Sequence, residues 1–404
     1  MKKASFVQHP LLTPQALISY FISFMVGSLM AQIIPTLSVY LVNRFSSTAF
    51  ELGLFFIALA ASSIVTSQVV GRFSDNGISR PKLIFLSSLA GAGACLLFAL
   101  STRYWMALIT GITLLSLATI AFPQIMAHTR EYANTAIPGS QIALFNSVLR
   151  ASFALAWIAG PPLGFQLQHW LGDSLHYVLL ALSYSVVGLM ALWFLPTLKR
   201  QPTQAIAGAI TVPLNLKLGV VAMALLFGVN HSYLISLPQL IQTQLGLSPA
   251  YAGYVMGLAA ALEIPIMLLG GWLGSRIALI PLIRVGAFSA IMLYLGVWTS
   301  NALWQLFALQ IFNAVFVGMV AGLGPTWFQD QIPKHTGYAS SLFVNAINLG
   351  NILGGLIIGV FAAWLGYRHV FMVNAVVASA ALAVLFFCHY GLSTHANPNN
   401  KSPA

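Results

Sequence analysis

The sequence predicts an all-α membrane protein in which twelve transmembrane helices form two six-helix halves. The first observation is composition. The 404 residues are 59% hydrophobic and 6% charged, with a mean hydropathy of +0.87, whereas roughly a quarter of the residues in a soluble domain carry charge. The second is that apolar runs long enough to cross a bilayer, about 20 residues, recur along the chain. The third is that the second half of the chain repeats the first.

Charged residues, Gly and Pro breaks and Asn/Ser clusters separate the apolar runs. The limits of the twelve expected helices are 15–42, 51–70, 83–101, 104–129, 140–167, 176–196, 216–243, 250–274, 282–299, 303–328, 336–363 and 369–390. The longest polar interruption, 199–213, is predicted to be a central cytoplasmic loop between an N-terminal half (1–198) and a C-terminal half (214–392). Residues 393–404 are rich in Asn and Pro, and we expect them to form a disordered tail.

The basic residues predict the orientation, because cytoplasmic loops carry an excess of Lys and Arg. With the N-terminus inside, thirteen of the seventeen basic residues lie on the cytoplasmic side and three on the outer side, while Arg150 lies within a helix. We therefore expect a multi-pass protein with both termini in the cytoplasm. The same single, scattered basic residues form no stripe or tail, which argues against a nucleic-acid partner.

The two halves carry related residues at nearly constant spacing. The matches at an offset of 200 are Gly53 with Gly253 and Gly71 with Gly271, and those at 199 are Trp105 with Trp304, Glu131 with Asp330, Asn146 with Asn345 and Gly160 with Gly359. Trp170-Leu171-Gly172 recurs as Trp364-Leu365-Gly366. A parallel repeat related by an axis along the membrane normal is an architecture of secondary transporters.

A charged turn, Gly71–Lys82, is predicted to join the second and third helices. Its acid, Asp75, can accept hydrogen bonds from a helix N-terminus or pair with a nearby Arg. We interpret the charged residues at this side as an inner gate, consisting of Asp75, Arg130, Glu131 and Asp330. The alternative is a set of solvated surface charges that contribute little.

Two charges are predicted near the middle of the membrane. Glu263 lies about twelve residues from the inner end of its helix and Arg150 about ten residues into its own, roughly 18 Å and 15 Å deep at 1.5 Å per residue. Ionisable residues at such depths are costly and mark functional sites by default. We expect Arg150 and Glu263 to pair, and Glu263 to take up a proton when the pair separates, which would couple transport to protons. The alternative is a static ion pair.

Neutral polar side chains within the apolar runs describe a cavity with little charge. They are Gln32, Gln124, Asn146, Asn230, His231, Gln239, Gln310, Asn313, Asn345 and Asn348. Amides inside helices also hold neighbouring helices together. Sugars are bound by amide and guanidinium donors beside aromatic rings, and Trp157, Tyr233, Phe312 and Trp327 are the candidate rings. The predicted substrate-binding residues are Arg150, Glu263, His231 and these amides without Gln310.

Other classes of function lack their signatures in this sequence. No Gly-rich loop with Lys predicts ATP binding, and no His/Cys/Asp constellation predicts an enzyme active site or a metal site. We therefore expect a transporter that is not an enzyme and that needs no cofactor and no metal.

Five blocks carry a resemblance to a known family. Gly71–Lys82 resembles the loop between helices 2 and 3 of the major facilitator superfamily, and Gly160-Pro161-Pro162-Leu163-Gly164 resembles the helix 5 signature of its exporters. Taken with His128–Ala133, Leu262–Pro265 and Trp327–Asp330, the helix 5 block makes the chain, from about residue 15 to 390, similar to the bacterial sugar efflux transporter family.

The resemblance implies the major facilitator fold and export of sugars and glycosides such as lactose, glucose and thiogalactosides. It further implies proton antiport and a monomer in the bacterial inner membrane. Two alternatives stay open. A proton-coupled multidrug exporter of the same superfamily would have an apolar, aromatic cavity with few amides. Sugar uptake by symport uses the same fold, although the helix 5 block favours export.

Overall fold

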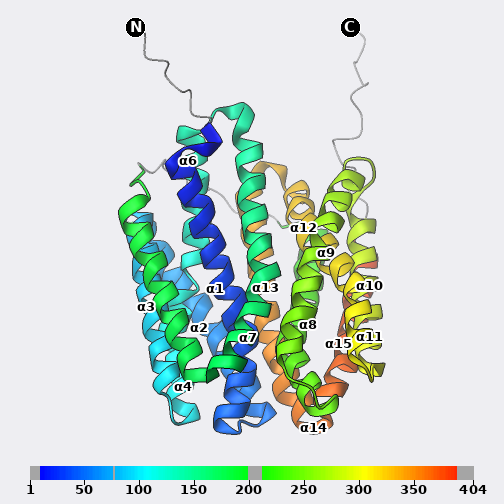
Figure 1. Cartoon of the computed structure of the whole chain (residues 1–404). Helices are drawn as coiled ribbons and strands as arrows, with labels where there is room; N and C mark the ends of the chain where they lie inside the picture. The colour runs from blue at the N-terminus through cyan, green and yellow to red at the C-terminus, as the bar shows by residue number, and fades with distance from the viewer. Residues whose placement is uncertain (1–9, 76–77, 199–211, 389–404) are drawn as a thin grey trace, which may run out of the picture. The chain divides into compact units, whose positions relative to one another are not determined.

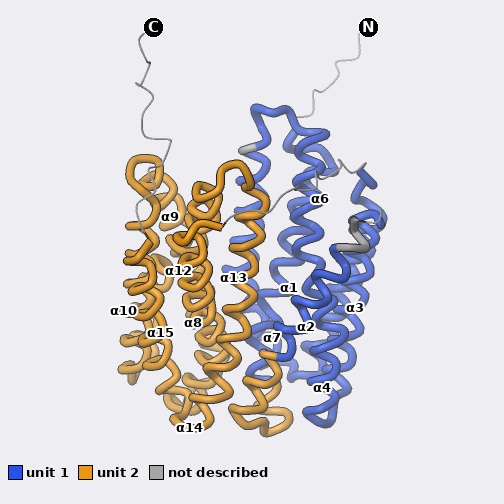
Figure 2. Tube along the Cα trace, turned by 180° about the vertical axis from the view of Figure 1, so that it is seen from behind, with its two compact units in different colours: residues 1–40, 58–206 blue, residues 41–57, 207–404 orange. Residues whose placement is uncertain are grey.

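The computed structural model describes residues 10–75, 78–198 and 212–388, and its described part is entirely helical apart from the connections. The predicted tail and all but the last two residues of the predicted central loop lie outside these ranges. Figure 1 labels the helices along the chain. The contacts divide the chain into two compact units, coloured in Figure 2: unit 1 comprises residues 1–40 and 58–206, and unit 2 comprises residues 41–57 and 207–404.

The helices follow one another with short connections. From the N-terminus to residue 194 they are η1 (Pro10–Leu12), α1 (Pro14–Phe45), α2 (Ala49–Asp75), α3 (Arg80–Leu100), α4 (Tyr104–Thr110), the π-helical turn η2 (Gly111–Leu115), α5 (Ser116–Ala118), α6 (Ala121–Ala136) and α7 (Gly139–Phe194). The remainder are α8 (Leu214–Gln244), α9 (Ala250–Gly274), α10 (Leu279–Thr299), α11 (Leu303–Ala308), α12 (Gln310–Gln331), η3 (Pro333–His335), α13 (Thr336–Ile357), the π-helical turn η4 (Ile358–Ala362), α14 (Ala363–Leu365) and α15 (Tyr367–Phe387).

Within the described ranges, eleven segments are long and apolar enough to cross a membrane. One of them, α7, has 56 residues, more than twice the length that a single crossing needs. Its backbone leaves the helical conformation at Gly172, where φ is +75°. Dividing α7 at this glycine gives the twelve crossings that the sequence predicts.

The Trp-Leu-Gly repeat has one structural role in both units. Gly366 has φ +79° and ψ 163°, nearly the same as Gly172 with φ +75° and ψ 167°. Glycine adopts a positive φ without the steric cost that a side chain imposes. Each glycine therefore ends one long helix and begins the next. Trp170 and Trp364, two residues before the glycines, are exposed.

Glycine contacts correct the predicted register of the repeat. A Cβ on Gly160 would lie 2.7 Å from Cβ of Ala31 on α1, and a Cβ on Gly354 would lie 2.9 Å from Cβ of His231 on α8. Ala31 and His231 correspond, because α1 and α8 begin 200 residues apart. The counterpart of Gly160 is therefore Gly354, at an offset of 194, and the predicted match with Gly359 is wrong.

The offset of 194 also changes the partners of two predicted site residues. Asn146 corresponds to Ser340, so its predicted equivalence with Asn345 is wrong. The buried residues support this register, since Phe145 and Leu149 on α7 correspond to the buried Ala339 and Phe343 on α13. Five residues separate this offset from the 199 that relates α3 to α10 and α4 to α11, and an ungapped sequence comparison does not detect the change.

The predicted turn Gly71–Lys82 is shorter in the structure. Helix α2 continues to Asp75, and α3 begins at Arg80. Pro81 occupies the first turn of α3, where a missing backbone N–H costs nothing. Helix α2 runs through Gly71, so this glycine does not break the helix. The side chain of Asp75 lies outside the described residues.

The start of α2 belongs to unit 2 by its contacts. A Cβ on Gly53 would lie 2.3 Å from Cα and 2.4 Å from N of Gly359 in η4, and 2.6 Å from the carbonyl oxygen of Gly355 at the end of α13. Only helices without side chains at these points can approach so closely. Phe56, one turn later, packs its ring edge-to-face against His231 on α8, with ring centroids 5.7 Å apart.

Candidate substrate and coupling site

One face of α7 carries two of the predicted site residues. Asn146 and Arg150 are one turn apart and both exposed, and the partly buried Phe153 and Trp157 continue the same face. Arg150 lies eleven residues after the start of α7, about 16 Å along the helix axis. No described residue of unit 1 forms an ion pair with it.

Glu263 is the corresponding charge in unit 2. It is partly buried, and it lies eleven residues before the end of α9, again about 16 Å along the axis. Among the described residues of unit 2, no cation forms an ion pair with it. Arg276 instead stacks over the ring of Trp272 at 4.0 Å, and Arg284 donates to the carbonyl oxygens of Leu385 and Cys388. Each unit thus presents one deep charge without a partner of its own.

Polar side chains also follow the accessible faces of α8 and α13. Asn230 and His231 are partly buried on the stripe of α8 that includes Phe227 and Leu234. On α13, the accessible positions at helical spacing are Ser341, Asn345, Asn348 and Ile352. These residues are available to a polar ligand that carries no charge.

Gln32 occupies a different setting on α1. Its amide nitrogen donates to the hydroxyl oxygen of Ser28 at 3.0 Å. The helix 5 block lies against the same turn, since a Cβ on Gly164 would be 3.1 Å from Cα, Cβ and Cγ of Gln32. Part of the hydrogen-bonding capacity of Gln32 is therefore used within unit 1, and the Gly-Pro block serves helix packing there.

Asn313 and Gln239 are buried inside unit 2 and do not line an accessible surface. The oxygen of the Gln310 side chain accepts hydrogen bonds from the hydroxyl of Tyr233 at 3.1 Å and from the amide of Asn313 at 2.9 Å. In unit 1 the counterparts of Tyr233, Gln310 and Asn313 are apolar. They are Ile33, Gly111 and Leu114, respectively. We interpret the cluster as one that holds α8 and α12 together.

Two of the four aromatic rings that were candidates for sugar binding are buried as well. Tyr233 and Trp327 are almost inaccessible, and the Trp327 ring covers α8 at Gly219, where a Cβ would lie 2.4 Å from the ring. Trp157 is partly buried and Phe312 is exposed. Trp157 and Phe312 therefore remain candidates.

Gln124 and Glu131 belong to a polar cluster at one end of unit 1. The guanidinium of Arg80 donates to the Gln124 side-chain oxygen at 3.1 Å and to a carboxylate oxygen of Glu131 at 2.7 Å. Both Arg80 and Glu131 are largely buried. Sequence reasoning missed Arg80, although its place in the basic part of the loop, beside Pro81 at the start of α3, was a usable signal.

The other predicted gate residues are in different positions. Arg130 and Asp330 are exposed. The counterparts of Arg80 and Gln124 in unit 2 are Leu279 and Leu323, so unit 2 keeps the acid, Asp330, without this cluster. At this end of unit 1, Arg80 joins Gln124 and Glu131.

Glu131→Gln is expected to lower the free energy of unfolding by about 2 kcal/mol, because it removes a charge-assisted hydrogen bond from a largely buried guanidinium. Thermal unfolding of the purified protein in detergent measures the effect. Arg130→Gln is the matched control, since an exposed neighbour is expected to change stability by no more than about 0.5 kcal/mol. Equal unfolding midpoints for the two variants would show that the Arg80–Glu131 bond contributes nothing to stability.

Comparison with known proteins identifies the family to which this chain belongs. The family model described as Major Facilitator Superfamily matches residues 16–303 and 287–404. The chain belongs to the Major Facilitator Superfamily. A solved structure of a point mutant of the nucleoside transporter NupG has a TM-score of 0.80 at 15% identity, over 92% of this chain and 98% of that one. At this identity the likeness concerns the fold.

Two relatives are much closer in sequence. Sugar efflux transporter A of Dickeya chrysanthemi is 35% identical over 90% of this chain and 93% of its own. Sugar efflux transporter A of Escherichia coli (strain K12) is also 35% identical, over 89% of this chain and 93% of its own. The two relatives confirm the predicted resemblance to the bacterial sugar efflux transporters. The solved structure confirms the predicted major facilitator fold. The chain is a multi-pass membrane transporter and not an enzyme.

Proposed function

We propose that this protein exports sugars and glycosides, such as lactose, glucose and thiogalactosides, across the bacterial inner membrane in exchange for protons. The observation that carries the proposal is the identity of 35% with two bacterial sugar efflux transporters over about nine-tenths of the chain. The accessible amides of α7, α8 and α13 support it, because uncharged hydroxyl groups are recognised by such donors and acceptors.

The proposed set of substrate-binding residues is smaller than the set that the sequence predicts. Those on accessible or partly accessible faces are Gln32, Asn146, Arg150, Asn230, His231, Glu263, Asn345 and Asn348. Buried Gln239 and Asn313 support the bundle, and Gln124 supports the Arg80 cluster. Arg150 provides guanidinium donors for sugar hydroxyls once it separates from Glu263.

Proton coupling is assigned to Arg150 and Glu263. Each lies deep in its own helix without an ion-pair partner among the described residues of its own unit. A deep, unpaired charge is costly in a bilayer. In this mechanism the two residues pair in one transport state and separate in the other, where Glu263 takes up a proton. The gate residues of the proposal are Asp75, Arg130, Glu131 and Asp330, with both termini in the cytoplasm and the protein acting as a monomer.

Counterflow in proteoliposomes tests the substrate class. Vesicles preloaded with unlabelled lactose are expected to take up labelled lactose transiently, whereas vesicles preloaded with a lipophilic cation are expected not to take up the labelled cation. The reverse pattern would identify the protein as a multidrug exporter. Vesicles without protein provide the background for both substrates.

A further inference from the structure

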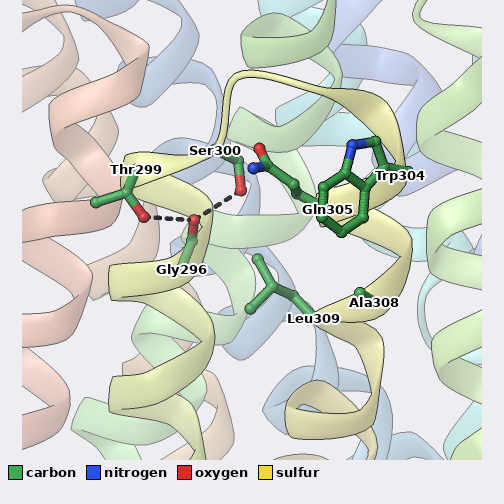
Figure 3. A pocket seen from close by; sticks show the side chains of 7 residues that line it. All are labelled: Gly296, Thr299, Ser300, Trp304, Gln305, Ala308 and Leu309. Atoms are coloured by element: carbon green, nitrogen blue, oxygen red, sulfur yellow. Dashed lines mark hydrogen bonds between the residues drawn. The ribbon is translucent and has the colours of Figure 1, made fainter.

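A shallow groove of about 260 Å³ lies at the connection between α10 and α11 in unit 2. Its lining includes the small or apolar residues Gly296, Ala308 and Leu309, the ring of Trp304, and the polar Thr299, Ser300 and Gln305. Figure 3 shows the side-chain amide of Gln305 beside that ring. The lining of the groove is therefore partly apolar and partly polar.

Several of the residues that line the groove differ from their counterparts in unit 1. At the offset of 199, these counterparts are Leu97 for Gly296, Met106 for Gln305 and Ile109 for Ala308. These three large side chains are exposed. At two of these positions, Gly296 and Ala308, the residue of unit 2 is smaller than its counterpart.

The groove opens where the chain leaves the membrane. Helix α10 ends at Thr299 and α11 begins at Leu303, and both belong to segments that span the bilayer. Trp304 is 69% exposed, and its counterpart Trp105 is 63% exposed. Exposed Trp at the ends of membrane spans marks the level of the lipid headgroups.

Arg368, on α15, contacts one of the lining residues, Ser300. The guanidinium of Arg368 donates to the Ser300 carbonyl oxygen at 3.1 Å and to the side-chain oxygen of Asn301 at 2.9 Å. Both acceptors are neutral, and in the described part of the chain no carboxylate pairs with Arg368. The oxygen of the Gln305 side chain accepts from the backbone of Asn301 and Ala302, which leaves its amide nitrogen available as a donor.

We propose that this groove binds one phospholipid with an anionic headgroup. An acyl chain lies on Gly296, Ala308 and Leu309, and the phosphate lies toward Arg368 and the Gln305 amide. The volume favours a slender occupant, since pockets for drug-sized ligands measure about 300–1,000 Å³. The uncompensated positive charge favours an anionic headgroup over a zwitterionic one.

Native mass spectrometry of the purified protein with added phosphatidylglycerol or phosphatidylethanolamine tests the proposal. The wild-type protein is expected to retain phosphatidylglycerol at least threefold more than phosphatidylethanolamine. Ala308→Ile places in unit 2 the residue that unit 1 carries, fills the groove, and is expected to reduce retention of both lipids about fivefold. Arg368→Gln is expected to abolish the preference between them.

Matched controls are Ala380→Ile, at an exposed position on α15, and Arg276→Gln, which removes a cation that stacks on Trp272. Neither is expected to change lipid retention. Equal phosphatidylglycerol retention by Ala308→Ile and the wild type would overturn the proposal, as would displacement of the lipid by lactose, which would assign the groove to a sugar. If Ala308→Ile fails to fold, Arg368→Gln tests the proposal. An unchanged preference of this variant for phosphatidylglycerol would then overturn it.

Discussion

Glu263→Gln is expected to abolish proton-driven accumulation of sugar in vesicles while leaving sugar counterflow within about twofold of the wild type. The glutamine side chain keeps the size and much of the hydrogen bonding of the acid but cannot carry a proton. Counterflow exchanges labelled for unlabelled sugar without net proton movement, so it survives. Accumulation against a gradient needs the protonation step, so it is lost.

The control for this variant is Glu51→Gln. Glu51 lies at the start of α2, where its carboxylate accepts hydrogen bonds from the backbone and hydroxyl of Thr48. An amide oxygen can accept the same bonds, and full proton-driven accumulation is expected. Accumulation by Glu263→Gln at the level of this control would remove Glu263 from the coupling mechanism. Loss of folding by Glu263→Gln alone would favour a static ion pair.

Gly53→Ala is expected to reduce sugar transport at least tenfold at equal expression. The added methyl group would lie 2.3 to 2.6 Å from backbone atoms of Gly359 and Gly355, and backbone atoms cannot move aside as a flexible side chain can. The start of α2 must then separate from α13 and η4. A transporter that alternates between two states needs each state to be accessible, so loss of one contact slows the cycle.

The matched control is Gly271→Ala on α9, where an added Cβ would meet nothing within 4 Å. This variant is expected to transport at the wild-type rate. Wild-type transport by Gly53→Ala would show that the close glycine contact is dispensable for the cycle.

Composition and periodicity were sufficient for the fold because each helix needs only an apolar run of sufficient length. The ends were harder to predict. The charged residues from Arg72 to Asp75 suggested a turn, yet α2 continues through them. Charge at the end of a membrane helix does not interrupt its backbone hydrogen bonds, so a change in composition marks the membrane boundary and not the end of the helix.

The internal repeat shows that some sequence matches between the halves are reliable and others are accidental. Trp170-Leu171-Gly172 was a reliable signal because only glycine tolerates the positive φ at residue 172. Asn146 and Asn345 were an accidental match, since the offset changes from 199 to 194 in the last part of each half. Packing of Gly160 against α1 and of Gly354 against α8 identified the change.

The candidate site was only partly predictable for a related reason. An amide in an apolar run gives no indication of which way it faces. Asn313 and Asn345 look equivalent in sequence, but Asn313 is buried against Gln310 and Asn345 is exposed. The ion pair of Glu131 depends on the approach of α3 to α6, which no local pattern encodes.

The central claim is that the protein exports sugar at the expense of a proton gradient. Inside-out membrane vesicles with an acidic lumen test it most directly, because their outer surface is the cytoplasmic face. With one proton exchanged per sugar, a difference of one pH unit, about 1.4 kcal/mol, sustains about tenfold accumulation. We predict that labelled lactose concentrates in the lumen by this factor and leaves when a protonophore is added. Equilibration of lactose without accumulation, unaffected by the protonophore, would contradict the claim.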